Sequence, residues 1–160
     1  MATKKKAPQK DAIALLKEDH EKVRALLASL EKTTDGKADR RITLLQKIER
    51  ELHVHTTIEE EIFYPAYRDK AETKEDRALY YEANEEHDVV RMYLPQMHSS
   101  DLAGEKFAAK ATVLRELVEH HAKEEEKDMF KKARKLLSKD ELRDLGGRMA
   151  ARKRQLQREP

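Results

Sequence analysis

Residues 55–65 read HTTIEEEIFYP, and this stretch decides the fold because it places ionisable side chains on the apolar side of a helix. His55 and Glu59 lie four residues apart, so both point to the same face of an α-helix. Leu52 precedes them on that face and Ile62 follows them. A carboxylate buried among apolar side chains is costly unless a partner compensates its charge.

The same pattern recurs 66 residues later, where HAKEEEKDMF (121–130) aligns with HTTIEEEIFY (55–64). A second pair of segments aligns at an offset of 67 residues: EDHEKVRALL (18–27) with EEHDVVRMYL (85–94). We therefore interpret the chain as two copies of one helical hairpin. Each copy has a lone histidine on its first helix and an H-x-x-x-E motif on its second.

Apolar residues recur at intervals of three and four, which predicts long amphipathic helices. The predicted helices cover about 11–31, 39–64, 74–94 and 105–137, with an end at Pro65 and a bend at Pro95. A fifth helix is expected after Ser138, because Ser138 and Glu141 have capping-box spacing.

These helices predict an all-α fold, an antiparallel up-down-up-down four-helix bundle with an additional C-terminal helix. The expected domain organisation is a disordered basic tail over 1–10, the bundle over 11–137, and a C-terminal helix over 138–160 that packs on it.

Composition excludes several classes of function. The 160 residues include 34 Lys and Arg against 32 Asp and Glu, and this balance disfavours nucleic-acid binding. The absence of cysteine removes disulfides, cysteine metal sites and thiol catalysis. No apolar run is long enough for a membrane span or a secretory signal, so we expect a cytoplasmic protein, either a monomer or a small homo-oligomer.

Ionisable residues on the inner stripes of the predicted helices point to a metal site. One such histidine alone is usually a satisfied core residue, but four histidines with two glutamates are not readily explained that way. No Lys or Arg occupies these stripes, so a cation must supply the compensating charge. The candidate ligands are His20, His55, Glu59, His87, His121 and Glu125.

Six ligands exceed the four of a closed zinc site and fit two metals bridged by the two glutamates. Mixed nitrogen and oxygen ligands favour iron, with manganese as the less favoured ion. Neither the H-E-x-x-H motif of zinc proteases nor the E-x-x-H pair of ferritin-like bundles is present.

The segments DHEKV, HTTIEEEIFYP, EEHDVV and HHAKEEEKDMF together resemble the helix motifs of hemerythrin-like (HHE cation-binding) domains over about residues 11–135. The tail DLGGRMAARKRQL resembles that of bacterial members near the mycobacterial group. The resemblance implies an oxo- or hydroxo-bridged, non-haem di-iron centre. It makes Glu59 and Glu125 the bridges, His20 and His55 the ligands of one iron, and His87 and His121 the ligands of the other.

The chain departs from oxygen-carrying hemerythrins, which have H-x-x-x-H on the third helix. Here the residue four after His87 is Arg91, and its repeat partner is Arg24. Tyr64 or Tyr67 is a candidate for the missing ligand. The two arginines either polarise a bound peroxide or lie on the solvated edge, and the second interpretation is favoured.

Family members bind oxygen reversibly, sense oxygen or iron, respond to nitric oxide, or dismutate hydrogen peroxide. The favoured hypothesis is reaction with hydrogen peroxide or dioxygen, with catalase-like activity as its concrete form. The alternatives are binding, storage or sensing of oxygen, iron or nitric oxide without turnover, and a structural bundle without metal. The remaining histidines and glutamates of these motifs are expected at the surface or behind the ligands: His53, His98, His120, Glu60, Glu61, Glu124 and Glu126.

Overall fold

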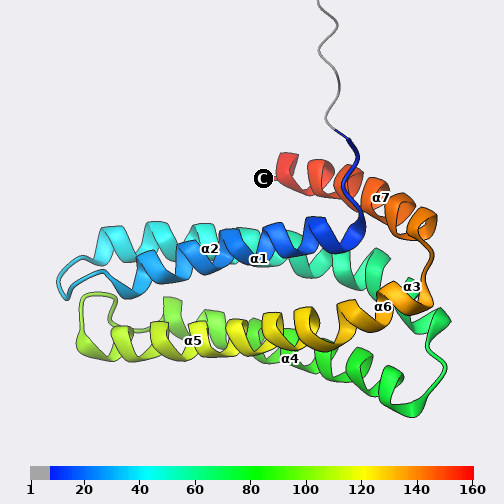
Figure 1. The fold of residues 1–160 in the computed structure, drawn as a ribbon. Coiled ribbons are helices and arrows are strands. Elements are labelled where there is room, and N and C mark those ends of the chain that lie inside the picture. Colours follow the sequence, from blue (N-terminus) through cyan, green and yellow to red (C-terminus); the bar gives the residue numbers. More distant parts are fainter. Residues whose placement is uncertain (1–7) are drawn as a thin grey trace, which may run out of the picture.

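The computed structural model describes residues 8–160, and every regular element in that range is helical (Figure 1). Two π-helical segments, η1 (Glu59–Phe63) and η2 (Glu125–Met129), each join two α-helices without a loop. In chain order the α-helices are α1 (Ala12–Glu31), α2 (Ala38–Ile58), α3 (Tyr64–Lys70), α4 (Lys74–His98), α5 (Glu105–Glu124), α6 (Phe130–Leu136) and α7 (Lys139–Arg158). Among these described residues, no helix is both long enough and apolar enough to cross a membrane.

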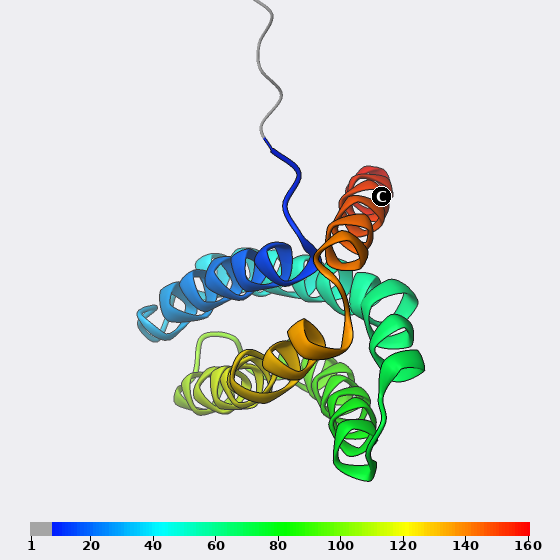
Figure 2. The same cartoon turned by 45° about the vertical axis from the view of Figure 1, so that its right-hand side comes forward.

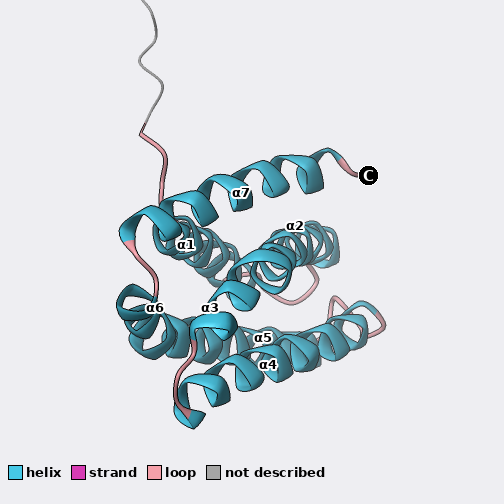
Figure 3. Cartoon of the chain, turned by 90° about the vertical axis from the view of Figure 1, so that its right-hand side faces the viewer, coloured by secondary structure: helices cyan, strands magenta, loops and turns pink. Residues whose placement is uncertain are grey.

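The helices α1, α2, α4 and α5 form an antiparallel bundle, which confirms the predicted fold class (Figures 1 and 3). The hairpin of α1 and α2 packs on the hairpin of α4 and α5. Helix α7 lies across the outside of α1 and α2 as the additional C-terminal helix (Figure 2). Its start has the predicted capping box, in which Ser138 and Glu141 each bond the other's backbone N–H. Of the tail predicted over residues 1–10, residues 1–7 lie outside the described range.

Three predicted helix boundaries were wrong. The second helix does not end at Pro65 but continues through η1 into α3, and Pro65 lies there just after the widened turn. The third continues through Pro95 to His98, because the apolar stripe continues to the fully buried Met97. The segment predicted as one helix over 105–137 is divided by η2. In each case tertiary packing outweighs a local break in the backbone hydrogen bonding.

The apolar core has two parts, separated by a polar layer. Along α1, the buried residues of 12–16 belong to the first part, His20 follows, and Val23, Leu27 and Leu30 belong to the second. The other bundle helices pass from one part to the other at the same level. Along α5, for example, Phe107, Ala111, Leu114 and Val118 pack in the second part, and His121 comes next. Helices α3, α6 and α7 close the first part.

At the far end, the buried Arg41 ties the two hairpin loops together. Its guanidinium donates hydrogen bonds to the carbonyl oxygens of Leu102 at 2.8 Å and Gly104 at 3.1 Å, and it pairs with Asp35 at 3.0 Å. This connection keeps the two hairpins in register, and with them the polar layer.

Candidate metal centre

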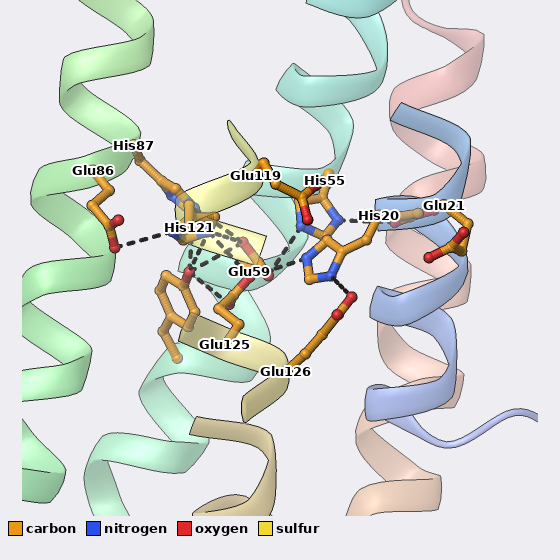
Figure 4. Close-up of polar contacts among 12 residues, drawn as sticks. His20, Glu21, His55, Glu59, Glu86, His87, Glu119, His121, Glu125 and Glu126 are labelled. Carbon is orange, nitrogen blue, oxygen red and sulfur yellow. Dashed lines mark hydrogen bonds and ion pairs between the residues drawn. The ribbon is translucent and has the colours of Figure 1, made fainter. Parts of the chain in front are cut away.

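All six side chains singled out in the sequence meet in the polar layer, and each is at least nine-tenths buried. Glu59 and Glu125 lie between two pairs of histidines that come from the four bundle helices (Figure 4). The histidine pairs are His20 with His55 in one half and His87 with His121 in the other.

The two carboxylates face both histidine pairs. Oε1 of Glu59 lies 3.1 Å from Nε2 of His55, and its Oε2 lies 3.1 Å from Nε2 of His87. Oε1 of Glu125 lies 3.1 Å from Nε2 of both His20 and His121. Each glutamate therefore reaches both halves: Glu59 places one oxygen on each half, and Glu125 places the same oxygen on both.

The π-helical segments place aromatic side chains beneath these glutamates. In η1 the N–H of Tyr64 bonds the carbonyl oxygen of Glu59, five residues earlier, and in η2 the N–H of Phe130 bonds that of Glu125. The widened turn brings the fifth residue under the glutamate, where a regular α-helix would rotate it away. It also buries Phe63 completely, whereas Ile62, which we expected on the inner face, is only partly buried.

The two aromatic residues make the halves of the centre unequal. The hydroxyl of the buried Tyr64 lies 3.2 Å from Nε2 of His87, 3.0 Å from Oε2 of Glu125 and 3.2 Å from Oε2 of Glu59. Its counterpart Phe130 has no polar atom to offer. The Phe130 ring stacks on His20 at 5.8 Å between ring centroids. Of the two tyrosines considered from the sequence, Tyr64 lies at the centre.

Tyr67 lies away from the centre. Its hydroxyl donates a hydrogen bond of 2.9 Å to the carbonyl oxygen of Asp76.

Each of the four histidines bonds a second carboxylate through Nδ1, on the side away from the centre. The partners are Glu126 for His20 at 2.8 Å, Asp19 for His55 at 3.2 Å, Glu60 for His87 at 2.7 Å, and Glu86 for His121 at 3.3 Å. Such carboxylates orient a ligating imidazole and increase its basicity. With Nδ1–H donating to them, each Nε2 presents its lone pair to the centre.

Two of these four carboxylates, Asp19 and Glu86, were missed in the sequence. Each directly precedes a lone histidine, in EDH and EEH, and this repeated acidic neighbour was the available signal. Glu60 and Glu126 were expected at the surface or behind the ligands, and they hold His87 and His20.

The two arginines extend this network outward. Arg24 donates to Glu126 at 3.0 Å, and Arg91 donates to Glu60 at 2.6 Å. Arg91 is 46% exposed and Arg24 only 23%, so the solvated-edge interpretation describes Arg91 better than Arg24. Both act on a carboxylate that holds a histidine.

The remaining predicted surface residues lie away from the centre. His53 is exposed, His98 pairs with Glu49 at 3.0 Å, and His120 pairs with Glu124 at 3.3 Å. Glu61 pairs with Arg152 of α7 at 2.7 Å.

Opposite charges stabilise the ionised forms of His55 and Glu59. Burial by itself would lower the pKa of His55, but the Glu59 carboxylate and the hydrogen bond to Asp19 raise that pKa to about 10. Burial would raise the pKa of Glu59, but the neighbouring histidines hold it well below its usual value. Burial and the two nearby carboxylates raise the pKa of Tyr64.

The geometry fits metal ions better than an internal hydrogen-bond network. Nε2 of His55 and Oε1 of Glu59 are buried and lie 3.1 Å apart, yet neither has a hydrogen-bond partner in the described chain. The nitrogens of His87 and His121 also lie 3.1 Å apart. Two ligands at about 2.1 Å from one ion and at right angles lie about 3 Å apart, so these spacings match the edges of a coordination polyhedron.

A cavity of about 30 Å³ adjoins the four histidines. Five apolar side chains from the four bundle helices line it: Val23, Leu52, Val90, Val118 and Ala122. A water needs about 10–15 Å³ measured in this way, so the cavity holds one or two water-sized molecules. Tyr64 does not line it. A small molecule in this cavity would therefore contact the histidine side of the centre and not Tyr64.

A helical bundle with a buried cluster of histidines and carboxylates at its middle defines the class of four-helix-bundle cation-binding domains. The chain belongs to the hemerythrin HHE cation binding domain family, whose model matches residues 11–133, and this confirms the resemblance predicted from the motifs. It is similar to the crystal structure of a hemerythrin HHE cation binding domain-containing protein from Mycobacterium kansasii. The two chains are 26% identical with a TM-score of 0.80, over 92% of this chain and 87% of the other. No curated protein sequence matches the chain.

Proposed function

We propose that the chain is a non-haem di-iron protein that reacts with hydrogen peroxide or dioxygen. The observation that carries this proposal is that each buried glutamate reaches histidines of both halves. His20 and His55 would hold one iron, His87 and His121 the other, with Glu59 and Glu125 as bridges. A bound iron pair supplies Lewis acidity and two-electron redox chemistry.

The residues around the centre select a small substrate. The cavity of about 30 Å³ admits a molecule of about two heavy atoms and excludes larger organic substrates. Its apolar walls exclude bulk water, which strengthens electrostatic interactions with any bound molecule. The half-buried Arg24 also lines the cavity, but its guanidinium already donates to Glu21, Glu119 and Glu126, so it holds the carboxylate that supports His20. Dismutation of hydrogen peroxide is the reaction that we favour.

Binding, storage or sensing of oxygen, iron or nitric oxide without turnover is the alternative function. The same ligands and the same cavity would serve it. The difference between the two functions is turnover, which must be measured.

One experiment separates these functions from a metal-free structural role. The purified protein is analysed for iron, its visible spectrum is recorded, and oxygen release is followed after hydrogen peroxide is added. About two irons per chain with sustained oxygen release supports the enzyme. Iron without oxygen release supports a carrier or sensor, and a protein that binds no iron under reducing, anaerobic reconstitution contradicts both. Manganese is measured in the same samples.

We also propose that Tyr64 supplies a further ligand to the iron held by His87 and His121. Its hydroxyl is fully buried and lies 3.2 Å from Nε2 of His87, which again matches a coordination edge. A tyrosinate bound to ferric iron absorbs visible light, so Tyr64→Phe should remove that band while iron is retained. Tyr67→Phe is the control, because Tyr67 bonds only a backbone carbonyl and should leave the spectrum unchanged. An unaltered spectrum of Tyr64→Phe would exclude this ligand.

A further inference from the structure

The outer carboxylates follow the internal repeat. Asp19 precedes His20 and bonds His55, and its repeat partner Glu86 precedes His87 and bonds His121. The other two carboxylates cross between the halves and carry one arginine each. In these carboxylates and arginines, the two halves of the centre are equivalent.

A lysine from α7 breaks this equivalence. The ammonium of Lys153 bonds Oδ1 of Asp19, while Oδ2 of Asp19 accepts the hydrogen bond from Nδ1 of His55. Within residues 8–160, no lysine or arginine bonds the repeat partner Glu86, whose Oε2 is buried without a hydrogen bond. Nε2 of the exposed His120 lies 3.5 Å from that oxygen.

Helix α7 holds Lys153 firmly in this place. The preceding residue, Arg152, pairs with Glu61 at 2.7 Å, and Gly146 packs directly on the backbone at the start of α1. Asp19 is 4% exposed, so its two interactions are largely shielded from water. The helix follows residues 11–133, the segment that the family model matches.

The Lys153 ammonium influences the His55 imidazole through Asp19. A free carboxylate on Nδ1–H makes the histidine a stronger donor at Nε2. An ammonium on the far oxygen of that carboxylate draws charge away and weakens the effect. His55 should therefore donate less strongly to a metal than His121, whose carboxylate has no such cation.

We propose that Lys153 is a positioning residue of the C-terminal helix that acts through Asp19 to reduce the donor strength of His55, so that the two metal positions differ in reduction potential. This inference rests on the proposed di-iron centre. The position held by His20 and His55 then keeps the higher potential and is the first to be reduced.

The test is a redox titration of the iron-loaded full chain, followed by its visible spectrum. Lys153→Gln removes the ammonium, so we expect the higher of the two potentials to fall and the gap between them to narrow. Lys153→Arg keeps the charge and should restore the wild-type titration. Arg152→Gln is the matched control on the same helix, since its partner Glu61 bonds none of the histidines, and it should leave both potentials unchanged.

The outcomes distinguish this inference from the function on which it rests. If iron does not bind to the wild-type chain, the proposed function fails. If iron binds and Lys153→Gln titrates as the wild type does, or with a raised potential, the role of Lys153 is wrong. An equal shift in Arg152→Gln would mean that loosening of α7 is the cause, and that result also overturns the inference.

Discussion

Glu59 and Glu60 are neighbours with the same side chain, and the bundle gives them different environments. Glu59 is fully buried between the histidine pairs, while Glu60 reaches around the outside of His87 and bonds its Nδ1 at 2.7 Å. Glu61, the third in the row, points outward to Arg152 on α7. Rotation from one residue to the next along η1 thus separates three identical carboxylates into a buried group at the centre, a support of His87 and a surface ion pair.

The contribution of Glu60 to iron affinity can be measured by comparison with Glu61. Glu60→Ala removes the carboxylate that accepts from Nδ1 of His87, so we expect iron affinity to fall about 10–100-fold, as for other outer carboxylates of metal sites. Glu61→Ala should leave the affinity unchanged, because Glu61 contacts no histidine. Competition with an iron chelator measures both variants. Equal affinities in the two would contradict a supporting role for Glu60.

The positions of the six central residues were predictable, because their spacing places them on the apolar faces of the predicted helices. Asp19 and Glu86 were not predicted, since a residue next to a lone histidine is rotated away from it on the same helix. Both reach instead to a histidine on the neighbouring helix. That contact depends on the separation and rotation of two helices, which the periodicity of one helix does not specify.

Among the elements, the π-helical segments show most clearly what a regular repeat cannot predict. Counting at 3.6 residues per turn placed Ile62 inside, whereas the widened turn of η1 buries Phe63 and directs Tyr64 to the centre. The aromatic residue five positions after each H-x-x-x-E glutamate was the available signal. A π-turn costs regular hydrogen bonding, so its presence in both copies indicates that the centre requires it.

The contact between α7 and α1 depends on Gly146. A Cβ at this position would lie 2.7 Å from the carbonyl carbon of Asp11, 2.9 Å from the nitrogen of Ala12, and closer still to the carbonyl oxygen of Lys10. Gly146→Ala should therefore lower the free energy of unfolding by about 1–3 kcal/mol.

Gly147→Ala is the control, because its Cβ would meet only the side chain of Gln9 at 3.8 Å. It should raise stability by about 0.5–1 kcal/mol through helix propensity. Denaturant unfolding of both variants checks the pair. Similar changes in the two would mean that α7 does not pack as tightly as described.

Asp76 caps the start of α4 and makes its stability depend on pH. The ammonium of Lys132 lowers the pKa of Asp76 from 3.8 to about 2, against the opposing effect of burial. The unfolded chain therefore binds the proton more readily, and the stabilisation is present above about pH 4 and is lost as the pH falls to about 2. We expect about 1 kcal/mol, since solvent around Lys132 screens part of the interaction.

Asp76→Asn tests this in the metal-free protein, where loss of metal in acid cannot contribute. The difference in unfolding free energy between wild type and variant should be about 1 kcal/mol at pH 6 and should approach zero at pH 2. A difference that does not change with pH would show that the carboxylate charge contributes nothing.

For the whole molecule, the fold was more predictable than the arrangement inside it. Apolar periodicity and short loops are sufficient for a bundle, and the internal repeat pairs its hairpins. The asymmetry introduced by α7, Tyr64 and Phe130 depends on differences between the two copies, whose consequences require the packing of distant segments. Lys153 illustrates this, because 134 residues separate it from Asp19.

The polar layer divides the apolar core of the whole bundle, so bound metal should stabilise the connection between its two parts. Without metal, the four histidines and two carboxylates are compensated only by each other, by Tyr64 and by the outer carboxylates, whereas bound iron adds its binding free energy to folding. At a free iron concentration 100 times the dissociation constant, that contribution is about 2.7 kcal/mol. For a chain of this size we expect a rise of about 5–10 °C in the melting temperature.

Calorimetry of the iron-loaded and metal-free chains measures the difference, and His87→Ala serves as the control, since it should melt at the same temperature with and without iron. If the wild type also melts unchanged after iron is removed, the two parts of the core are held together by the helices alone, and the centre does not contribute to the stability of the fold.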